Sequence, residues 1–440
     1  MSANTQGCKH PVNSLFQKVL RRSMKQRLVP LFLGVLAFSV TSAPAETILK
    51  PEDRIAICGD SITEQKLYSA YIEDYLRVCQ PAKVSTMQFG WGGETSWGFE
   101  PRMAHDVLTF QPTLATTCYG MNDGGYSQLR EERETKYRAA MASIIKQFKD
   151  AGVRVVVGSP GVVDSFTYRK DPEQAIKYNQ TLSQLRDICK QLAQENGVVF
   201  ADVFGAMNDA MTKAKEKYGK EYPLAGGDGV HPGPNGHLVM AYAFLKAMGV
   251  DGNIGEIKVD LSSGEATASD GHKVDSSQGG VVSITSTRFP FCFYGDDLKD
   301  QSSTKGATEF VPFNQDLNRL MLVVSGGNAD KVKVTWGKSS KEFAATDLAK
   351  GINLAAEFMN NPFSDAFAAV DVAVRAKQSF ETQVFKNLIP GMRTIIDEDS
   401  ERAGEKIVIQ AAVQQWRVKD DAVNGAIKPV THIIKIEEVK

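Results

Sequence analysis

The sequence has no excess of charge of either sign, because 51 Lys and Arg residues face 52 Asp and Glu residues among its 440 residues. A protein that binds nucleic acid mainly through phosphates needs a basic excess, so nucleic acid is not expected as the main partner. Cysteine is scarce, with six residues at wide spacings and no Cys-x-x-Cys. No spacing of Cys and His matches a metal site, so the sequence predicts no bound metal.

The few cysteines also argue against a disulfide framework. Cys8 lies in the basic N-terminal segment, and five cysteines follow it, which is an odd number. Two of them, Cys58 and Cys118, lie in apolar runs, where Cys behaves as a small buried hydrophobic residue. We expect free core thiols rather than disulfides at Cys58, Cys79, Cys118, Cys189 and Cys292.

Long apolar runs are missing too. The run Leu28–Val40 has 13 residues, which is short for a membrane span. Six basic residues and no acidic one precede it, and Ala43-Pro44-Ala45 follows. This order is typical of a secretory signal peptide over residues 1–45, starting at Met1 or Met24. The alternative is an uncleaved anchor.

Cleavage of this leader has two consequences. It would leave 45 basic against 52 acidic residues, so the exported chain would be mildly acidic. We expect a periplasmic or extracellular protein without stable membrane insertion. Nothing in the sequence indicates its oligomeric state.

From position 54 to about 250, short apolar runs alternate with longer amphipathic ones. Apolar runs of this kind are typical of strands that are buried on both faces of a parallel sheet. Strand–helix alternation predicts an α/β domain over residues 46–250, with its active site at the carboxyl ends of the strands. The expected strands are Arg54–Cys58, Lys83–Phe89, Thr113–Tyr119, Val153–Gly158 and Gly197–Asp202, and the expected helices are Leu67–Cys79, Glu131–Ala151, Asp171–Asn196 and Pro234–Met248.

The pattern changes after Asp251. Residues 251–352 contain short alternating stretches that predict a small antiparallel β module. Residues 353–429 have a helical period, and Pro390-Gly391 predicts a turn between two helices. The last stretch, 430–439, is strand-like and is expected to pair with the β module. The alternative is an unpaired tail.

Two polar groups supply the residues of a nucleophilic site. Ser61, in Gly59-Asp60-Ser61-Ile62-Thr63, follows the first strand and precedes a helix. A serine needs a base to act as a nucleophile at neutral pH. Asp228 and His231, three residues apart before the last helix, suit a base and the carboxylate that orients it. Taken alone, Ser61 is better explained as a helix cap, and a lone exposed His231 as a solvated loop residue.

Two further groups could stabilise an oxyanion. Gly90-Trp91-Gly92-Gly93-Glu94 follows the second strand, and the backbone N–H of Gly93 could donate to a developing negative charge. Gly120-Met121-Asn122-Asp123 follows the third strand, and the Asn122 amide could do the same. Each group alone is an ordinary loop. Together, all four groups fall at one edge of the predicted sheet.

These four groups resemble, in order and rough spacing, the four blocks of the SGNH (GDSL-type) hydrolase family, over about residues 52–250. The resemblance implies a flavodoxin-like three-layer α/β/α fold with five parallel strands. It further implies Ser61 as nucleophile, His231 as base and Asp228 as its orienting carboxylate. The oxyanion hole would comprise the N–H groups of Ser61 and Gly93 and the Asn122 side chain. Neither a metal nor an organic cofactor is expected.

One residue departs from the family pattern. The second block often carries Asn where this sequence has Gln88, which puts the loop geometry in doubt. His237, six residues after His231, is expected to be structural. Trp91 and Trp97 flank Gly93 and could stack on a sugar ring, although packing beneath the loop is an equal alternative.

The sequence thus predicts a secreted serine esterase that acts on carboxylic esters, with acylated glycan as its partner. One alternative is an acyltransferase that uses the same site. Another is a glycan-binding protein with a vestigial hydrolase domain. No task can be assigned to residues 251–440, although Trp336 and the aromatic run Phe289–Tyr294 are expected in the core rather than at a binding surface.

Overall fold

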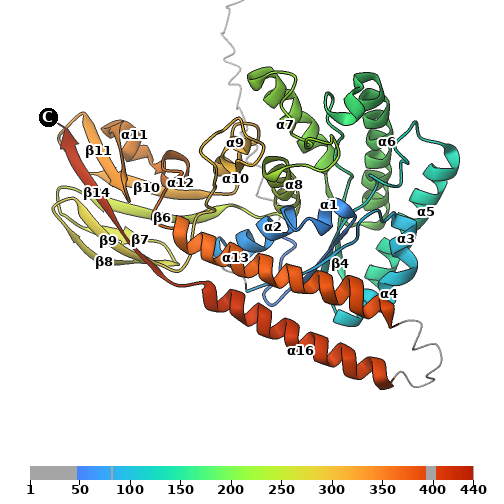
Figure 1. Ribbon diagram of the computed structural model, residues 1–440. Helices are drawn as coiled ribbons and strands as arrows, with labels where there is room; N and C mark the ends of the chain where they lie inside the picture. The colour runs from blue at the N-terminus through green and yellow to red at the C-terminus, as the bar shows by residue number, and fades with distance from the viewer. Residues whose placement is uncertain (1–46, 81–82, 393–402, 440) are drawn as a thin grey trace, which may run out of the picture. The chain divides into compact units, whose positions relative to one another are not determined.

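The computed structural model describes residues 47–80, 83–392 and 403–439 (Figure 1). The predicted signal peptide and Cys8 lie outside these residues. The described residues form one compact unit. No helix within the described ranges is long and apolar enough to cross a membrane.

A five-stranded parallel sheet organises the first half of the described chain. Its order is β2-β1-β3-β4-β5, and every neighbouring pair is parallel, as predicted. Ile55 and Ile57 of β1 face one apolar core cluster, whereas Ala56 and Cys58 face another. The sheet is therefore buried on both faces, which explains its continuous apolar runs. The strands are β1 (Arg54–Gly59), β2 (Ser85–Gly90), β3 (Leu114–Cys118), β4 (Arg154–Gly158) and β5 (Val199–Ala201).

Helices cover both faces of this sheet, so the predicted α/β class is confirmed. Helix α7 was not predicted, because its apolar positions are sparse and mixed with Lys and Glu. The longer helices are α2 (Tyr68–Val78), α5 (Glu131–Asp150), α6 (Pro172–Asn196), α7 (Val203–Tyr218) and α8 (Pro234–Ala247). Shorter ones are α1 (Ser61–Glu64), α3 (Ser96–Phe99), η1 (Glu100–Arg102), α4 (Met103–Asp106), η2 (Leu108–Phe110) and η3 (Tyr168–Lys170).

Two further sheets follow, in the orders β13-β10-β6-β7 and β12-β11-β14-β9-β8. All strand pairs of the second of these sheets are antiparallel, as expected. In the first, however, β6 and β10 pair in parallel. A parallel pair needs a long crossover, and the chain between these two strands supplies it. The strands are β6 (Asn253–Asp260), β7 (Ala266–Ala268), β8 (His272–Gln278), β9 (Val281–Ser286), β10 (Arg319–Ser325), β11 (Lys331–Trp336), β12 (Ser339–Ala344), β13 (Ile352–Asn353) and β14 (Val430–Val439). Four short helices accompany them, α9 (Thr304–Ala307), α10 (Phe313–Asp316), α11 (Ala345–Lys350) and α12 (Leu354–Glu357).

The C-terminal strand β14 lies between β9 and β11, so the predicted pairing with the β module is confirmed. A buried polar chain links these strands: His272 Nδ1 lies 2.8 Å from Ser286 Oγ, and that oxygen lies 3.0 Å from His432 Nε2. Trp336 Nε1 donates to His432 Nδ1 over 3.1 Å. Trp336 is completely buried, as expected of a core residue.

Two long helices, α13 (Ser364–Glu381) and α16 (Ala403–Ala426), lie side by side, and α16 leads into β14 (Figure 1). Between them come the π-helical segment η4 (Thr382–Leu388) and α14 (Ile389–Gly391). The turn predicted at Pro390-Gly391 is wrong, since both residues are helical. Both belong to α14, which continues η4 without a break.

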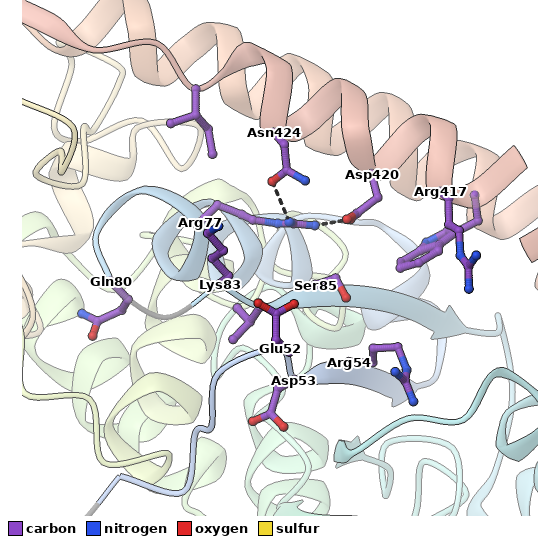
Figure 2. A pocket seen from close by; sticks show the side chains of 13 residues that line it. Glu52, Asp53, Arg54, Arg77, Gln80, Lys83, Ser85, Arg417, Asp420 and Asn424 are labelled. Carbon is purple, nitrogen blue, oxygen red and sulfur yellow. Dashed lines mark hydrogen bonds and ion pairs between the residues drawn. The ribbon is translucent and has the colours of Figure 1, made fainter. Parts of the chain in front are cut away.

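Helix α16 lies beside the amino-terminal ends of β1 and β2. Residues of the helix and of these strand ends line a groove of about 700 Å³. Figure 2 shows Arg77 of α2 reaching Asp420 and Asn424 of α16. Arg54 and Ser85 begin the two strands and line the same groove. The groove therefore lies at the sheet edge opposite the predicted catalytic residues.

All five cysteines after Cys8 are free and buried, as expected. Burial raises the pKa of the Cys189 thiol to about 12. These thiols are core residues.

Candidate active site

Ser61 is the first residue of α1 and follows directly on the turn out of β1. Asp60 caps this short helix, because its Oδ1 accepts the N–H of Ile62 over 3.0 Å. The Ser61 side chain is half-buried, and its Oγ lies 2.9 Å from His231 Nε2. The structure thus brings together two side chains that are 170 residues apart in the sequence.

Asp228 orients the His231 ring. Its Oδ2 lies 2.7 Å from His231 Nδ1, and its Oδ1 accepts the N–H groups of Val230 (2.8 Å) and His231 (2.9 Å). Partial burial raises the pKa of Asp228, but the hydrogen bonds from His231 and Val230 outweigh this effect and lower the net pKa. The carboxylate therefore stays ionised at neutral pH, and the ring carries its proton on Nδ1, which leaves Nε2 free to accept a proton from Ser61.

The loops of Gly93 and Asn122 meet beside Ser61. Gly93 is exposed and has φ +75°, a conformation that favours glycine. Asn122 Nδ2 donates to the backbone oxygen of Glu94 over 3.0 Å, which ties the two loops together. Its Oδ1 accepts the hydroxyl of Tyr126 over 2.8 Å, so the amide orientation is fixed and its second N–H can face a substrate.

Two residues that the sequence interpretation missed, Glu94 and Tyr126, hold this arrangement. Glu94 accepts two hydrogen bonds from Arg102, of 2.5 and 2.6 Å, and a third of 3.0 Å from the Tyr119 hydroxyl. Tyr126 has φ +56°, and no feature of the local sequence predicts this positive value. The sequence offers one indication of the role of Glu94, namely its position next to Gly93.

Buried carboxyl groups lie behind the site. Burial raises the pKa of Asp60 to about 7 and that of Asp123 to about 6. Asp123 accepts both the N–H (2.7 Å) and the hydroxyl (2.5 Å) of Ser96, which anchors the loop of Asn122 to α3. These buried carboxyls hold the turn of Ser61 and the loop of Asn122.

Gln88 ties the second strand to the turn that carries Ser61. Its Nε2 donates to the backbone oxygen of Thr63 over 2.7 Å. Its backbone N–H donates to Glu381 Oε2 of α13 over 2.9 Å. Gln88 therefore has a hydrogen-bonding role, and it connects α13, the second strand and the turn of Ser61.

His237 is completely buried and structural in its contacts. Its Nδ1 accepts the N–H of Tyr68 over 3.3 Å, so Nε2 carries the proton and donates it to Gln65 Oε1 over 2.7 Å. Burial lowers its pKa to about 3. The ring is therefore neutral in the folded protein at any pH above about 4.

We expect His237 to make the folded state sensitive to mild acid. The unfolded chain takes up a proton below about pH 6.5 and the folded chain does not, so stability falls as the pH drops below that value. Between pH 7 and pH 5 this group alone should remove about 2 kcal/mol from the free energy of unfolding. Urea denaturation of the wild type and of His237→Gln at both pH values measures the difference. Equal pH dependence in the two proteins would contradict this assignment.

The two tryptophans take different positions. Trp91 is partly exposed, with the Arg102 guanidinium 4.8 Å and Lys386 Nζ 5.8 Å from its ring centroid. Trp97 packs against the apolar core, with Arg133 5.8 Å from its ring. Both rings are thus partly exposed, Trp97 with one side packed against the core and Trp91 next to Gly92 and Gly93.

Within residues 47–80, 83–392 and 403–439 there is no group of three His, Cys, Asp or Glu side chains placed to hold a metal ion. The chemistry available at this edge is that of a hydroxyl, an imidazole with an ionised partner, and N–H donors. Such a set can transfer an acyl group through a serine.

Comparison with known proteins identifies the domain that carries these residues. Residues 57–239 match the model of the GDSL-like lipase/acylhydrolase family. This segment is a GDSL-like acylhydrolase domain. An acetylxylan esterase of Geobacillus stearothermophilus is 24% identical over 192 residues, which cover 42% of this chain and 81% of that protein. The domain is thus that of an ester-hydrolysing enzyme.

Solved structures extend the comparison beyond the acylhydrolase domain. A gut microbial diltiazem-metabolizing enzyme aligns with 89% of this chain and 99% of its own, at a TM-score of 0.69 and 22% identity. The crystal structure of an acetylxylan esterase from Geobacillus stearothermophilus aligns with 46% of this chain and 95% of its own, at a TM-score of 0.38 and 22% identity. The first likeness shows that the fold of the acylhydrolase domain together with most of the C-terminal half occurs in another protein.

Proposed function

We propose that this protein is a secreted serine esterase that removes acyl groups, acetyl foremost, from carbohydrate. The observation that carries the proposal is the hydrogen-bonded series Ser61 Oγ–His231 Nε2 and His231 Nδ1–Asp228 Oδ2, at 2.9 and 2.7 Å. The similarity to an acetylxylan esterase supports a carbohydrate ester as substrate. The partly exposed Trp91 supplies an aromatic surface for a sugar ring.

In the proposed reaction His231 takes the proton of Ser61 while Oγ attacks the ester carbonyl. The N–H groups of Ser61 and Gly93 and the Asn122 amide stabilise the oxyanion of the tetrahedral intermediate. His231 then gives the proton to the departing sugar hydroxyl, which leaves an acyl group on Ser61. Water, deprotonated by His231, attacks this acyl-enzyme; the bond between the acyl carbon and Ser61 Oγ breaks, His231 returns the proton to Oγ, and the acid is released.

We further propose the domain limits and the location that the sequence indicates. Residues 1–45 would be the export signal and 46–250 the catalytic domain, followed by the β module of residues 251–352 with strand 430–439 and by the helical segment 353–429. The basic, then apolar, then small-residue order of the leader supports export.

An acetate-release screen tests the substrate class. Acetylated xylan oligosaccharides and p-nitrophenyl esters of two, four and eight carbons are offered to the purified protein, and released acid is measured. We expect acetate from the oligosaccharides and a preference for the two-carbon ester. If no acetylated glycan is cleaved while longer esters are, the carbohydrate assignment is wrong. Acetyl transfer to an added sugar acceptor, without free acetate, would favour the acyltransferase alternative.

The Asn122 amide has its own test. Asn122→Ala should lower kcat for p-nitrophenyl acetate by about 10²- to 10³-fold, because one donor to the oxyanion is lost. Tyr126→Phe should cause a smaller loss, since it removes only the hydroxyl that orients the amide. Steady-state kinetics of both variants measures these losses. Equal losses would show that the amide does not contact the reacting oxygen.

A further inference from the structure

The C-terminal half reaches the acylhydrolase site through Lys386 of η4. Its Nζ forms an ion pair with Oε1 of Glu64, which lies three residues after Ser61 at the end of α1. The other carboxylate oxygen, Oε2, accepts the backbone N–H of Gly92 over 2.5 Å. One carboxylate therefore joins the helix of Ser61, the glycine loop and a cation that is more than 300 residues away in the sequence.

This junction lies immediately beside the proposed nucleophile. A Cβ added at Gly92 would lie 4.0 Å from Lys386 Nζ and 4.0 Å from Ser61 Cβ. Lys386 Nζ also lies 5.8 Å from the Trp91 ring centroid. The side chains of Lys386 and Glu64 are 25% and 23% exposed, so the pair lies at the rim of the site and not in the core.

Segment η4 is held firmly against the acylhydrolase domain. Phe385 is buried, with its ring centroid 4.6 Å from that of Phe89 and 4.5 Å from that of Phe110. On the other side, Lys66 Nζ donates to the backbone oxygen of Glu64 over 2.7 Å and to Thr382 Oγ1 over 3.5 Å.

The π-helical form of η4 is a second, independent observation. Seven residues, Thr382–Leu388, have this form at the place where the chain passes the site. π-Helical turns are rare and occur frequently at functional sites. The wider turn changes the direction of successive side chains, and here Phe385 points into the core while Lys386 reaches the rim.

We propose that Lys386 is a positioning residue of the acylhydrolase site, acting through Glu64 on the Gly92–Gly93 loop. The ammonium group holds the Glu64 carboxylate, this carboxylate fixes the Gly92 N–H, and the next peptide presents the Gly93 N–H to the oxyanion. The C-terminal half therefore completes the catalytic geometry. The inference rests on the proposed function, because it needs Gly93 as an oxyanion donor.

Three variants test this relay with p-nitrophenyl acetate as substrate. Lys386→Met and Glu64→Gln should each lower kcat roughly ten- to a hundredfold through displacement of the loop, with KM nearly unchanged. Lys386→Arg should keep most of the activity, because it preserves the charge. The double variant should be little worse than either single one, since both break the same relay.

Two controls separate the possible failures. Lys350→Met breaks an exposed ion pair with Asp347 within α11. This variant should leave kcat unchanged. Urea denaturation of each variant reports whether it is folded. If folded Lys386→Met keeps the wild-type kcat while Ser61→Ala is inactive, the relay is wrong and the proposed function stands. If Ser61→Ala keeps its turnover, both are overturned.

Discussion

Ser61→Ala should lower the turnover of p-nitrophenyl acetate by about 10⁴-fold or more while the protein stays folded. In the proposed mechanism the hydroxyl oxygen attacks the ester, and the substitution also removes the hydrogen bond to His231 Nε2. His231→Ala should cost about as much, and the double variant should be no worse than either one, because the two residues act as a unit. Steady-state kinetics at pH 7.5 measures the losses.

A matched control for Ser61 is Ser340→Ala. Ser340 lies on β12, where its exposed hydroxyl bonds Thr335 Oγ1 over 2.7 Å. This variant should retain full turnover and the wild-type circular dichroism spectrum. Substantial turnover by folded Ser61→Ala would refute the serine-esterase mechanism. A fluorophosphonate probe adds an independent readout, because it should label the wild type and Ser340→Ala but not Ser61→Ala.

Lys377→Met should destabilise the protein by about 3–5 kcal/mol, because it removes the cation of the buried Glu381 and leaves Glu73 paired with Arg77 alone. Lys377 Nζ lies 2.6 Å from Glu381 Oε1 and 3.1 Å from Glu73 Oε1, and all three side chains are completely buried. It also donates to the backbone oxygen of Thr86 over 2.7 Å. Burial lowers the pKa of Lys377, but Glu381 and Glu73 outweigh this and raise it, so the ammonium is charged.

Urea denaturation at pH 7.5 measures the effect through the transition midpoint. The double variant Lys377→Met with Glu381→Gln should recover part of the loss, since one buried charge is then removed with its partner. Lys136→Met, which breaks an exposed pair with Glu132 on α5, should leave the midpoint unchanged. An unchanged midpoint for Lys377→Met would show that the network is solvated or dispensable.

The same network explains how α13 protects an edge of the catalytic sheet. Strand β2 is the outer strand, so its free backbone groups need partners. Glu381 accepts the N–H of Gln88, and Lys377 donates to the oxygen of Thr86. A charged pair on an amphipathic helix thus supplies hydrogen-bond partners for two backbone groups of the strand. The Gln88 side chain in turn donates to the backbone oxygen of Thr63.

Local rules accounted for the sheet and for the candidate residues at its edge. A strand that is buried on both faces must be an apolar run, and this rule located all five strands of the parallel sheet. The predicted ends differ from the observed ones by at most two residues. The carboxyl ends of parallel strands converge, so Ser61, Gly93 and Asn122 could be assigned to one edge without coordinates. The parallel pairing of β6 and β10 could not be predicted, because alternation indicates a strand but not its direction.

The sequence by itself determined the α/β fold and which polar residues gather at the sheet edge, because burial and chain direction leave few alternatives there. Only the tertiary structure decided where the C-terminal half contacts the catalytic sheet and the turn of Ser61. Lys377, Glu381 and Lys386 belong to an ordinary amphipathic pattern, and their partners Glu73, Gln88 and Glu64 lie about 300 residues earlier. Contacts over such separations depend on how helices dock, and no local pattern encodes them.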